Sequence, residues 1–263
     1  MTIPPGTHVE IDGRPADAEN LLVPALLGTY AHFTALQVRD GRTRGLDLHL
    51  DRLDAATREL SGAELDGERV RTLLRGALDR AGRRDSAARV YVYFGADLKP
   101  TLMVTVRPPV DMPAEPQSLM SVPYQRPFPH IKHLGSFAQT HYGRLAAQAG
   151  FSDALLTGPG GVISEGAVAN IAFYEGTSVV WPDAPALTGI TMALLEPRLG
   201  DHGLPSAQRP VTLADLGAYR AAFVCNSQGI APVRLIDEVE FAVDERLMKT
   251  VAEAYAAVPW DVI

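Results

Sequence analysis

A proline-rich segment near the middle of the chain places the strongest constraint on its fold. Residues 108–129 contain seven prolines among 22 residues. Proline lacks a backbone donor and disrupts both helices and central strands. We therefore expect this segment to connect two domains, residues 1–107 and residues 130–263, with room for a strand in part of it.

The first 107 residues predict a small α+β domain. The turn dipeptides Asp12-Gly13 and Asp40-Gly41 punctuate alternating runs and are typical of β-hairpins. Two stretches with apolar residues at helical spacing, each followed by glycine, predict helices. In chain order we expect strands at 8–11, 32–38 and 43–46, helices at 50–60 and 70–81, and strands at 88–94 and 101–107.

The second half predicts a larger, mixed domain. Gly-rich turns at 158–161 and 175–176 separate strand-like runs, and three stretches have helical periodicity. In chain order we expect a helix ending at 149, strands at 154–157, 162–165, 170–174 and 178–181, a helix at 187–200, strands at 221–226 and 234–240, and a helix at 244–257. The fold class predicted from both halves is α+β.

Composition narrows the class of partner. The net charge is −7, and the arginine-rich residues 69–84 are interrupted or flanked by acids, which argues against nucleic acid and favours small molecules. The single cysteine, Cys225, excludes an internal disulfide and a multi-cysteine metal site, and we expect no metal. We predict neither a signal peptide nor a membrane span, and a cytoplasmic location.

Lys132 has the surroundings of a reactive amine. It is flanked by apolar residues and preceded by Pro127 and Pro129. A lysine that loses its water can act as a nucleophile in Schiff-base chemistry. The alternative is an ordinary solvated lysine, because lysines are rarely buried without a partner.

Glu165 ends an apolar strand-like run and precedes Asn170 by five residues. A carboxylate in partly buried surroundings needs a partner. A protonated heterocyclic nitrogen would serve, and so would a nearby arginine.

Three short segments have groups that suit a phosphate. Residues 189–191, Gly-Ile-Thr, open a predicted helix, whose free N–H groups attract anions. Residues 225–227, Cys-Asn-Ser, add N–H, amide and hydroxyl donors after a predicted strand. Arg52, one helical turn after His49, offers a planar fork that matches phosphate. Each has an ordinary alternative, which is a plain helix start, a turn and a solvated arginine.

In their order and spacing these segments resemble the class IV aminotransferase family. These are fold type IV pyridoxal-phosphate enzymes, which include branched-chain and D-amino acid aminotransferases and aminodeoxychorismate lyase. The resemblance spans nearly the whole chain. Its motifs are HLDRL at 49–53, IKHL at 131–134, Glu165-Gly166 with Asn170, LTGIT at 187–191, and Cys225-Asn226-Ser227 running into Ala231-Pro232-Val233.

The resemblance implies a fold, a cofactor and an assembly. The fold has a small N-terminal α+β domain and a larger C-terminal domain of mostly antiparallel, barrel-like sheets flanked by helices. The cofactor is pyridoxal 5'-phosphate (PLP), and the assembly is a homodimer.

The resemblance also assigns roles to individual residues. Lys132 resembles the lysine that forms the internal aldimine and moves the substrate α-proton. Glu165 resembles the acid that keeps the pyridine nitrogen protonated, and Leu187 the leucine that packs on the ring. The phosphate cup and the rest of the cofactor set correspond to Arg52, Asn170, Gly189, Ile190, Thr191, Asn226 and Ser227.

On the substrate side the sequence departs from the family pattern. Phe137 replaces a tyrosine that many members have five residues after the lysine. Phe94 replaces an arginine with which several members hold the substrate carboxylate. The candidates to replace these groups are His32, Tyr93, His133, His141 and Arg144. The substrate residues expected from the resemblance are His32, Thr34, Tyr93, Phe94 and Ala167.

Three functions follow from these features. The first is a PLP-dependent transaminase of amino acid metabolism, which moves an amino group between an amino acid or amine and a keto acid. The second is a lyase of the aminodeoxychorismate type, which releases pyruvate, because Asn226 and the IKHL form of the lysine segment are closer to that enzyme. The third is a binding relative without catalysis, against which intact Lys132, Glu165 and Thr191 speak.

Overall fold

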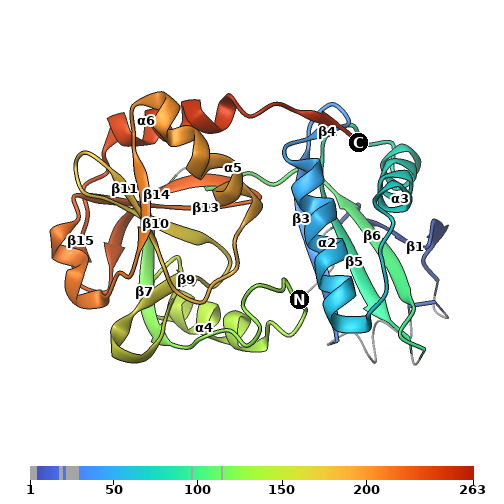
Figure 1. Cartoon of the computed structure of the whole chain (residues 1–263), viewed down its shortest axis with the longest axis horizontal. Coiled ribbons are helices and arrows are strands. Elements are labelled where there is room, and N and C mark those ends of the chain that lie inside the picture. Colours follow the sequence, from blue (N-terminus) through green and yellow to red (C-terminus); the bar gives the residue numbers. More distant parts are fainter. Residues whose placement is uncertain (1–4, 18–19, 22–29, 96, 114) are drawn as a thin grey trace. The chain divides into compact units, whose positions relative to one another are not determined.

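The computed structural model describes residues 5–17, 20–21, 30–95, 97–113 and 115–263, which fold as two compact units (Figure 1). Unit 1 comprises Met1–Val110, Ile131–Gly135 and Pro259–Ile263, and unit 2 comprises Asp111–His130 and Ser136–Val258. The segment that contains Lys132 thus belongs to unit 1, and the proline-rich connection belongs mainly to unit 2.

Unit 1 is built on an antiparallel five-stranded sheet in the order β2-β1-β6-β5-β3. Helices α2 and α3 pack on one face, because alternate strand residues such as Val90 and Val104 share a core with Leu53 and Leu74 of the helices. The elements are β1 (His8–Ile11), β2 (Arg14–Pro15), β3 (Ala31–Val38), α2 (Leu46–Ser61), α3 (Gly67–Arg80), β5 (Ser86–Phe94) and β6 (Pro100–Arg107).

Two distant segments complete unit 1. Strand β4 (Arg42–Thr43) pairs antiparallel with β16 (Asp261–Val262). The carboxylate of Asp261 accepts the Leu46 N–H at 2.9 Å, so it satisfies a free backbone donor in the first turn of α2. The segment Ile131–Gly135 lies along β3, where Phe33 N–H donates to the Lys132 carbonyl at 2.9 Å.

Unit 2 contains a nine-stranded, mostly antiparallel sheet in the order β12-β11-β10-β13-β14-β7-β8-β9, with β15 paired to β14. Strand β7 pairs in parallel with β14 and β8, and β11 with β12. The strands are β7 (Gln117–Pro123), β8 (Asp153–Thr157), β9 (Ile163–Gly166), β10 (Asn170–Tyr174), β11 (Val179–Pro182), β12 (Ser206–Arg209), β13 (Ala221–Asn226), β14 (Gly229–Ile236) and β15 (Val239–Glu240).

Helices cover this sheet. Helices α5 and α6 share a core with the sheet, in which the fully buried Trp181 meets Phe223 edge-on at 5.5 Å. The opposite core contains Phe173 and Val233, and α4 packs with Ala154 and Leu156. The helices are α4 (Phe137–Gln148), α5 (Ile190–Leu199) and α6 (Glu245–Ala256), with 3-10 turns at η1 (Pro159–Gly161), η2 (Gly200–His202) and η3 (Leu213–Ala218).

The predicted α+β class and the mostly antiparallel sheet of the second half are confirmed, and local boundaries differ for identifiable reasons. The run expected as a strand at 43–46 ends early because Gly45 adopts a left-handed φ of 67°, after which α2 begins. The run at 234–240 is divided by a turn at Asp237, whose φ is 49°. Strand β7 forms where prolines flank the segment rather than interrupt it. Among the described residues, no helix is both long and apolar enough to cross a bilayer.

Candidate functional site

Lys132 lies beside Phe33 of β3, on the face of the unit 1 sheet that α2 and α3 do not cover. Its Nζ is 5.0 Å from the centre of the Phe33 ring. Backbone bonds on both sides fix its position, since Leu134 N–H donates to the Ala31 carbonyl at 2.8 Å. Lys132 is therefore held by β3 rather than by a free loop.

Two basic residues of α2 lie near this lysine. His49 is 4% exposed, and its Nδ1 is 2.6 Å from the Thr34 hydroxyl. Burial, and next the charges of Arg52 and Lys132, lower the pKa of His49 to about 3, so the imidazole is neutral at physiological pH. Arg52 and Lys132 therefore both act electrostatically on His49.

Arg52 has an unused donor. Burial lowers the pKa of its guanidinium to about 10. Its Nε is buried and has no hydrogen-bond partner among the residues that the structure describes. Because buried polar groups are normally paired, an anionic ligand is a natural partner for this nitrogen.

His32 is a neutral residue of the layer between the sheet and α2. Its Nε2 lies 3.1 Å from the Thr57 hydroxyl, which itself donates to the Leu53 carbonyl at 2.7 Å. The imidazole must therefore donate through Nε2, which leaves Nδ1 as an acceptor without a partner in the described part of the chain. Burial lowers the pKa of His32 to about 4.

Tyr93 and Phe94 face opposite sides of the unit 1 sheet. Phe94 packs in the core beneath the helices, 6.0 Å from the His32 ring, whereas Tyr93 belongs to a cluster with Ile11 and Leu134. Burial raises the pKa of Tyr93 to about 12. Only Tyr93 therefore shares the sheet face of the Lys132 segment.

Glu165 in unit 2 is buried with a cation beside it. Its exposed fraction is 5%, and its Oε1 lies 3.3 Å from Nη1 of Arg126, which is also buried. Its other oxygen, Oε2, accepts the Leu187 N–H at 3.3 Å. The sequence left open whether an arginine would accompany Glu165. Arg126 was not singled out, although it is the lone arginine between Pro108 and Pro129.

Asn170 organises the start of α5. Its Nδ2 donates to the Leu187 carbonyl at 2.7 Å, and its Oδ1 accepts the Gly189 N–H at 3.0 Å. A Cβ at position 189 would overlap Asn170 Oδ1, so glycine is required there. Glu165 and Asn170 thus hold Leu187 from its two sides.

The two predicted anion-binding segments meet in unit 2. Thr191 Oγ1 donates to the Asn226 carbonyl at 2.8 Å, and Asn226 Nδ2 donates to the Val168 carbonyl at 3.3 Å. Thr191 is in the first turn of α5, which starts at Ile190 after an extended Gly189, so this contact adjoins the helix end whose first N–H groups have no partner within the helix. Ser227 directly follows Asn226 at the end of β13.

The remaining predicted residues lie on or near α4. Ala167 is 4% exposed, and its carbonyl accepts from Gln139 of α4 at 3.2 Å. Phe137 begins α4, is 83% exposed and stacks on His141. The structure therefore groups the predicted residues into one set in unit 1, around Lys132 and Arg52, and another in unit 2.

Comparison with known proteins identifies the family. The model for amino-transferase class IV matches residues 31–236. The chain belongs to the class IV aminotransferase family. A search of curated proteins gave no significant match.

Solved structures of class IV aminotransferase relatives share this fold. A hypothetical aminotransferase from Mycobacterium tuberculosis in its PLP-bound form has a TM-score of 0.82 at 23% identity, covering 96% of this chain and 98% of that one. The branched-chain aminotransferase from Thermoproteus uzoniensis with norvaline has a TM-score of 0.84 at 20% identity, covering 95% and 94%. A putative 4-amino-4-deoxychorismate lyase from Legionella pneumophila has a TM-score of 0.82 at 19% identity, covering 89% and 93%.

Two further arginines of this class IV family member were missed by sequence reasoning. Arg89 of β5 and Arg107 of β6 face away from α2 and α3, because their neighbours Val90 and Val106 belong to the helix-side core. Each has a buried Nε without a hydrogen-bond partner, and neither forms an ion pair within the described residues. Burial, and next the charge of Arg89, lowers the pKa of Arg107. The alternation of side chains along β5 and β6 could have predicted that both arginines lie on the sheet face opposite the helices.

Arg89 lies close to Lys132. Its Cζ is 5.5 Å from the Phe33 ring centre, from which Lys132 Nζ is 5.0 Å, so the two cations are at most 10.5 Å apart. Arg89 Nη1 also donates to the Tyr91 hydroxyl at 3.4 Å, and the Tyr91 ring stacks on Phe33 at 5.5 Å. Lys132, two aromatic rings and two guanidinium groups thus occupy one face of the sheet.

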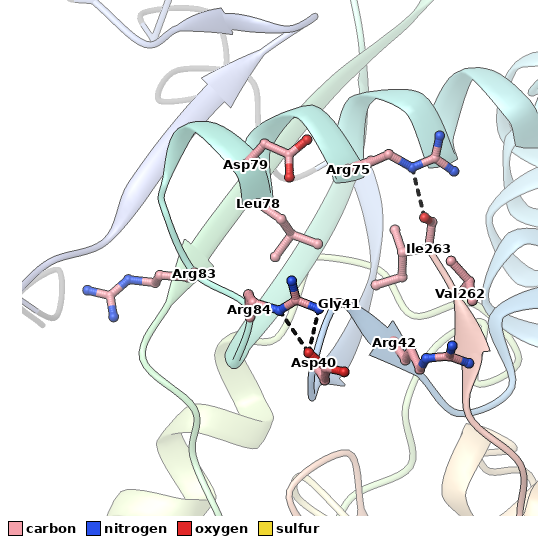
Figure 2. A pocket seen from close by; sticks show the side chains of 10 residues that line it. All are labelled: Asp40, Gly41, Arg42, Arg75, Leu78, Asp79, Arg83, Arg84, Val262 and Ile263. Carbon is pink, nitrogen blue, oxygen red and sulfur yellow. Dashed lines mark hydrogen bonds and ion pairs between the residues drawn. The ribbon is translucent and has the colours of Figure 1, made fainter.

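A pocket of about 310 Å³ elsewhere in unit 1 contains none of the predicted site residues. Figure 2 shows that its arginines do not converge, since Arg83 and Arg42 point in opposite directions. Arg84 is paired with Asp40, and Arg75 donates to the Ile263 carbonyl at 2.8 Å. We assign no ligand to this pocket.

Proposed function

We propose that this protein is a PLP-dependent aminotransferase, which moves an amino group between an amino acid or amine and a keto acid. The observation that carries the proposal is the environment of Glu165. This buried carboxylate has an arginine on one oxygen, and together with Asn170 it fixes Leu187. A fixed carboxylate suits a protonated ring nitrogen, and a leucine whose backbone is hydrogen-bonded to it suits an apolar ring face.

The donor groups present fit the phosphate and the ring of PLP. The first N–H groups of α5 and the side chains of Thr191, Asn226 and Ser227 suit the phosphate. In unit 1, the buried Nε of Arg52, which has no hydrogen-bond partner among the described residues, also suits an anion. PLP, when bound, supplies an electron sink for the carbon that carries the amine.

The chain's own residues then have distinct tasks. Lys132 Nζ would attach the cofactor and carry the proton that leaves the substrate Cα. Glu165 would hold a proton on the ring nitrogen, and Arg126 supports this by favouring the negative charge of the carboxylate. Neutral His49 keeps Thr34 in place without adding a third charge beside Lys132 and Arg52.

Arg89 and Arg107 are our proposal for the substrate carboxylate site. Phe94, at the position of the family's arginine, is in the core below the sheet and has no donor to offer. The two guanidinium groups instead supply unused donors on the face that carries Lys132. We therefore propose a carboxylic acid as substrate, which favours amino acids and keto acids over simple amines.

Replacement of Arg107 by glutamine should raise KM for the carboxylic substrate by about 10- to 100-fold, because a hydrogen bond to a charged group contributes about 1.5–3 kcal/mol. The matching variant Arg89→Gln should have a similar effect, and kcat should change less. Steady-state kinetics with a keto acid varied at saturating amino donor would measure this. Arg84→Gln, at a side chain 79% exposed, is the control. An unchanged KM in both site variants would refute the assignment.

The lyase is a second candidate, supported by Asn226 and by the fold shared with the Legionella pneumophila protein. The deciding assay incubates the purified protein with aminodeoxychorismate and without a keto acid. We expect no pyruvate from this mixture, and we expect amino transfer when an amino donor and a keto acid are supplied. Pyruvate formation without a keto acid would reject the transaminase in favour of the lyase.

Cofactor uptake separates both enzymes from a binding relative. We expect the protein to be yellow with PLP, and borohydride to fix the cofactor on Lys132. Protein that takes up no PLP would exclude both enzymes. We also propose a homodimer in the cytoplasm, as the resemblance and the single cysteine suggest, and sedimentation of the active protein as a monomer would contradict the dimer.

A further inference from the structure

Gln139 is a polar residue on the buried stripe of α4. Gln139, Tyr142 and Ala146 follow one another at helical spacing, three and then four residues apart. Ala146 is fully buried in a cluster with Ala154 of β8 and Ala167, and Tyr142 packs against this cluster. An apolar side chain would suit this stripe, so a glutamine in it requires another explanation.

The side-chain amide of Gln139 donates to a backbone carbonyl. Its Nε2 is 3.2 Å from the Ala167 carbonyl oxygen. Because a carbonyl oxygen only accepts, this contact fixes which end of the amide faces Ala167. The other end, Oε1, is buried and has no hydrogen-bond partner anywhere in the part of the chain that the structure describes. An unpaired buried acceptor is unfavourable, so stability alone does not favour glutamine here.

A helix-capping role is the simplest alternative. Ser136 and Gln139 have the spacing of a capping box, in which the glutamine side chain accepts the N–H of the capping residue. Within the described ranges of the chain, the Ser136 side chain makes no capping hydrogen bond and Gln139 Oε1 accepts none. Gln139 therefore serves the turn beside α4 rather than the end of α4 itself.

The turn of residues 166–169 joins Glu165 to Asn170, two members of the proposed cofactor set. Gly166 N–H donates to the Ala169 carbonyl at 2.7 Å. A Cβ at Gly166 would lie 3.2 Å from the same carbonyl oxygen, so the turn is compact. The geometry of this turn therefore sets the spacing between Glu165 and Asn170.

Side-chain amides from two elements hold this turn. Gln139 of α4 donates to the Ala167 carbonyl, and Nδ2 of Asn226, at the end of β13, donates to the next carbonyl, that of Val168, at 3.3 Å. The carbonyl of Asn226 in turn accepts from Thr191 Oγ1 at 2.8 Å. A continuous series of hydrogen bonds thus runs from α4 through the turn to the start of α5.

We propose that Gln139 is a positioning residue of the cofactor site, whose amide holds the turn of residues 166–169 and thereby places Glu165. This inference rests on the proposed function. The same turn carries the effect of Gln139 to Asn170 and Asn226. Gln139 need not touch the cofactor for this, because its donor is already used by the turn.

The test compares the full-length protein with Gln139→Glu, which keeps the shape of the side chain. An ionised carboxylate cannot donate to the Ala167 carbonyl, whereas the protonated acid can. We expect the dissociation constant for PLP to rise about ten-fold in the variant at pH 8, where that hydrogen bond is lost. At pH 5 the ratio to the wild type should approach one, because burial keeps the introduced acid protonated. Gln148→Glu, at an exposed residue of the same helix, is the control and should bind PLP like the wild type.

Gln139→Leu is the second variant. It lacks a donor at every pH, so we expect PLP binding to be about five-fold weaker at pH 8 and at pH 5 alike. Other groups around the turn also titrate or carry charge, and they include Asp153, Glu165 with its partner Arg126, and the exposed His141 and Arg144 of α4. These groups are present in the wild type and in both variants, so only Gln139→Glu should show a ratio that depends on pH.

Measurements on the protein without cofactor separate this role from helix capping. Glutamate is favourable at the third residue of a helix that follows serine, so capping predicts an unchanged or higher melting temperature for Gln139→Glu and an unchanged affinity for PLP. We expect instead that the Gly166 amide proton, which closes the turn onto Ala169, exchanges about five-fold faster in Gln139→Glu than in the wild type at pH 8.

The outcomes are separable. A wild type that does not bind PLP overturns the proposed function and this inference with it. A wild type that binds PLP overturns only the positioning role if both Gln139 variants keep its affinity at pH 8, if the ratio for Gln139→Glu persists at pH 5, or if exchange at Gly166 is unchanged. Weaker binding at pH 8 that returns to the wild-type value at pH 5 in Gln139→Glu, but not in Gln139→Leu, supports it.

Discussion

Alanine in place of Lys132 should reduce amino transfer by at least about 10³-fold, the largest effect on activity that we expect from any single substitution. The reason is that Lys132 combines two tasks, attachment of the cofactor and proton transfer, and no other lysine lies in the described part of its segment. The Lys132→Ala variant should remain folded, because the backbone hydrogen bonds between this segment and β3 do not depend on the lysine side chain. Single-turnover kinetics and absorbance after PLP addition would measure the loss.

Lys99→Ala is the matched control for this substitution. Lys99 belongs to the same unit, its side chain is 83% exposed, and it pairs only at the surface with Asp97. We expect full activity and normal colour in this variant. If Lys132→Ala kept more than a tenth of the activity, the assignment of the reactive amine to Lys132 would be wrong.

Arg126→Met should destabilise the protein by about 3–5 kcal/mol, the largest effect on stability that we expect, because removing one partner of a buried ion pair leaves the other charge uncompensated. The side chains of Arg126 and Glu165 are 4% and 6% exposed, so water cannot replace the lost guanidinium. Urea unfolding at neutral pH would measure the difference. Activity should fall as well, since Arg126 supports the charge of Glu165.

The double variant Arg126→Met with Glu165→Gln separates the ion pair from packing. With no carboxylate left to compensate, we expect it to be more stable than Arg126→Met alone, although inactive. Arg220→Met, which removes a guanidinium 67% exposed and 3.5 Å from Asp244, is the control and should change stability little. Equal losses in the single and double variants would mean that the arginine acts through packing rather than charge.

The sequence predicted most elements of both units from local periodicity. Apolar residues at helical spacing located α2, α3 and α6, and alternation located β3, β5 and β6. Left-handed residues such as Gly45 and Asp237 moved boundaries that periodicity alone cannot place. Strands β12 and β16 are short and are defined by their pairing with β11 and β4. Their local sequence therefore could not predict them.

Some residues of the candidate site could be predicted from the sequence, and others only from the structure. Lys132, Glu165, Asn170, Thr191 and Asn226 could be proposed from residue type, order and spacing, because each motif is local. Arg126, Arg89 and Arg107 could not, because their importance lies in what surrounds them. A guanidinium in a strand is usually solvated, and only the burial of Nε in Arg89 and Arg107 marks these two as donors without partners.

What the sequence by itself determined is therefore the class IV family pattern, the α+β class and the reactive residue types, since these depend on motifs and on periods of 2 and 3.6 residues. What only the tertiary structure decided is which charges meet. Arg126 reaches Glu165 because β7, which Arg126 follows, pairs with β8, and β8 pairs with β9, which contains Glu165. Such contacts depend on strand register between distant segments, which no local spacing encodes.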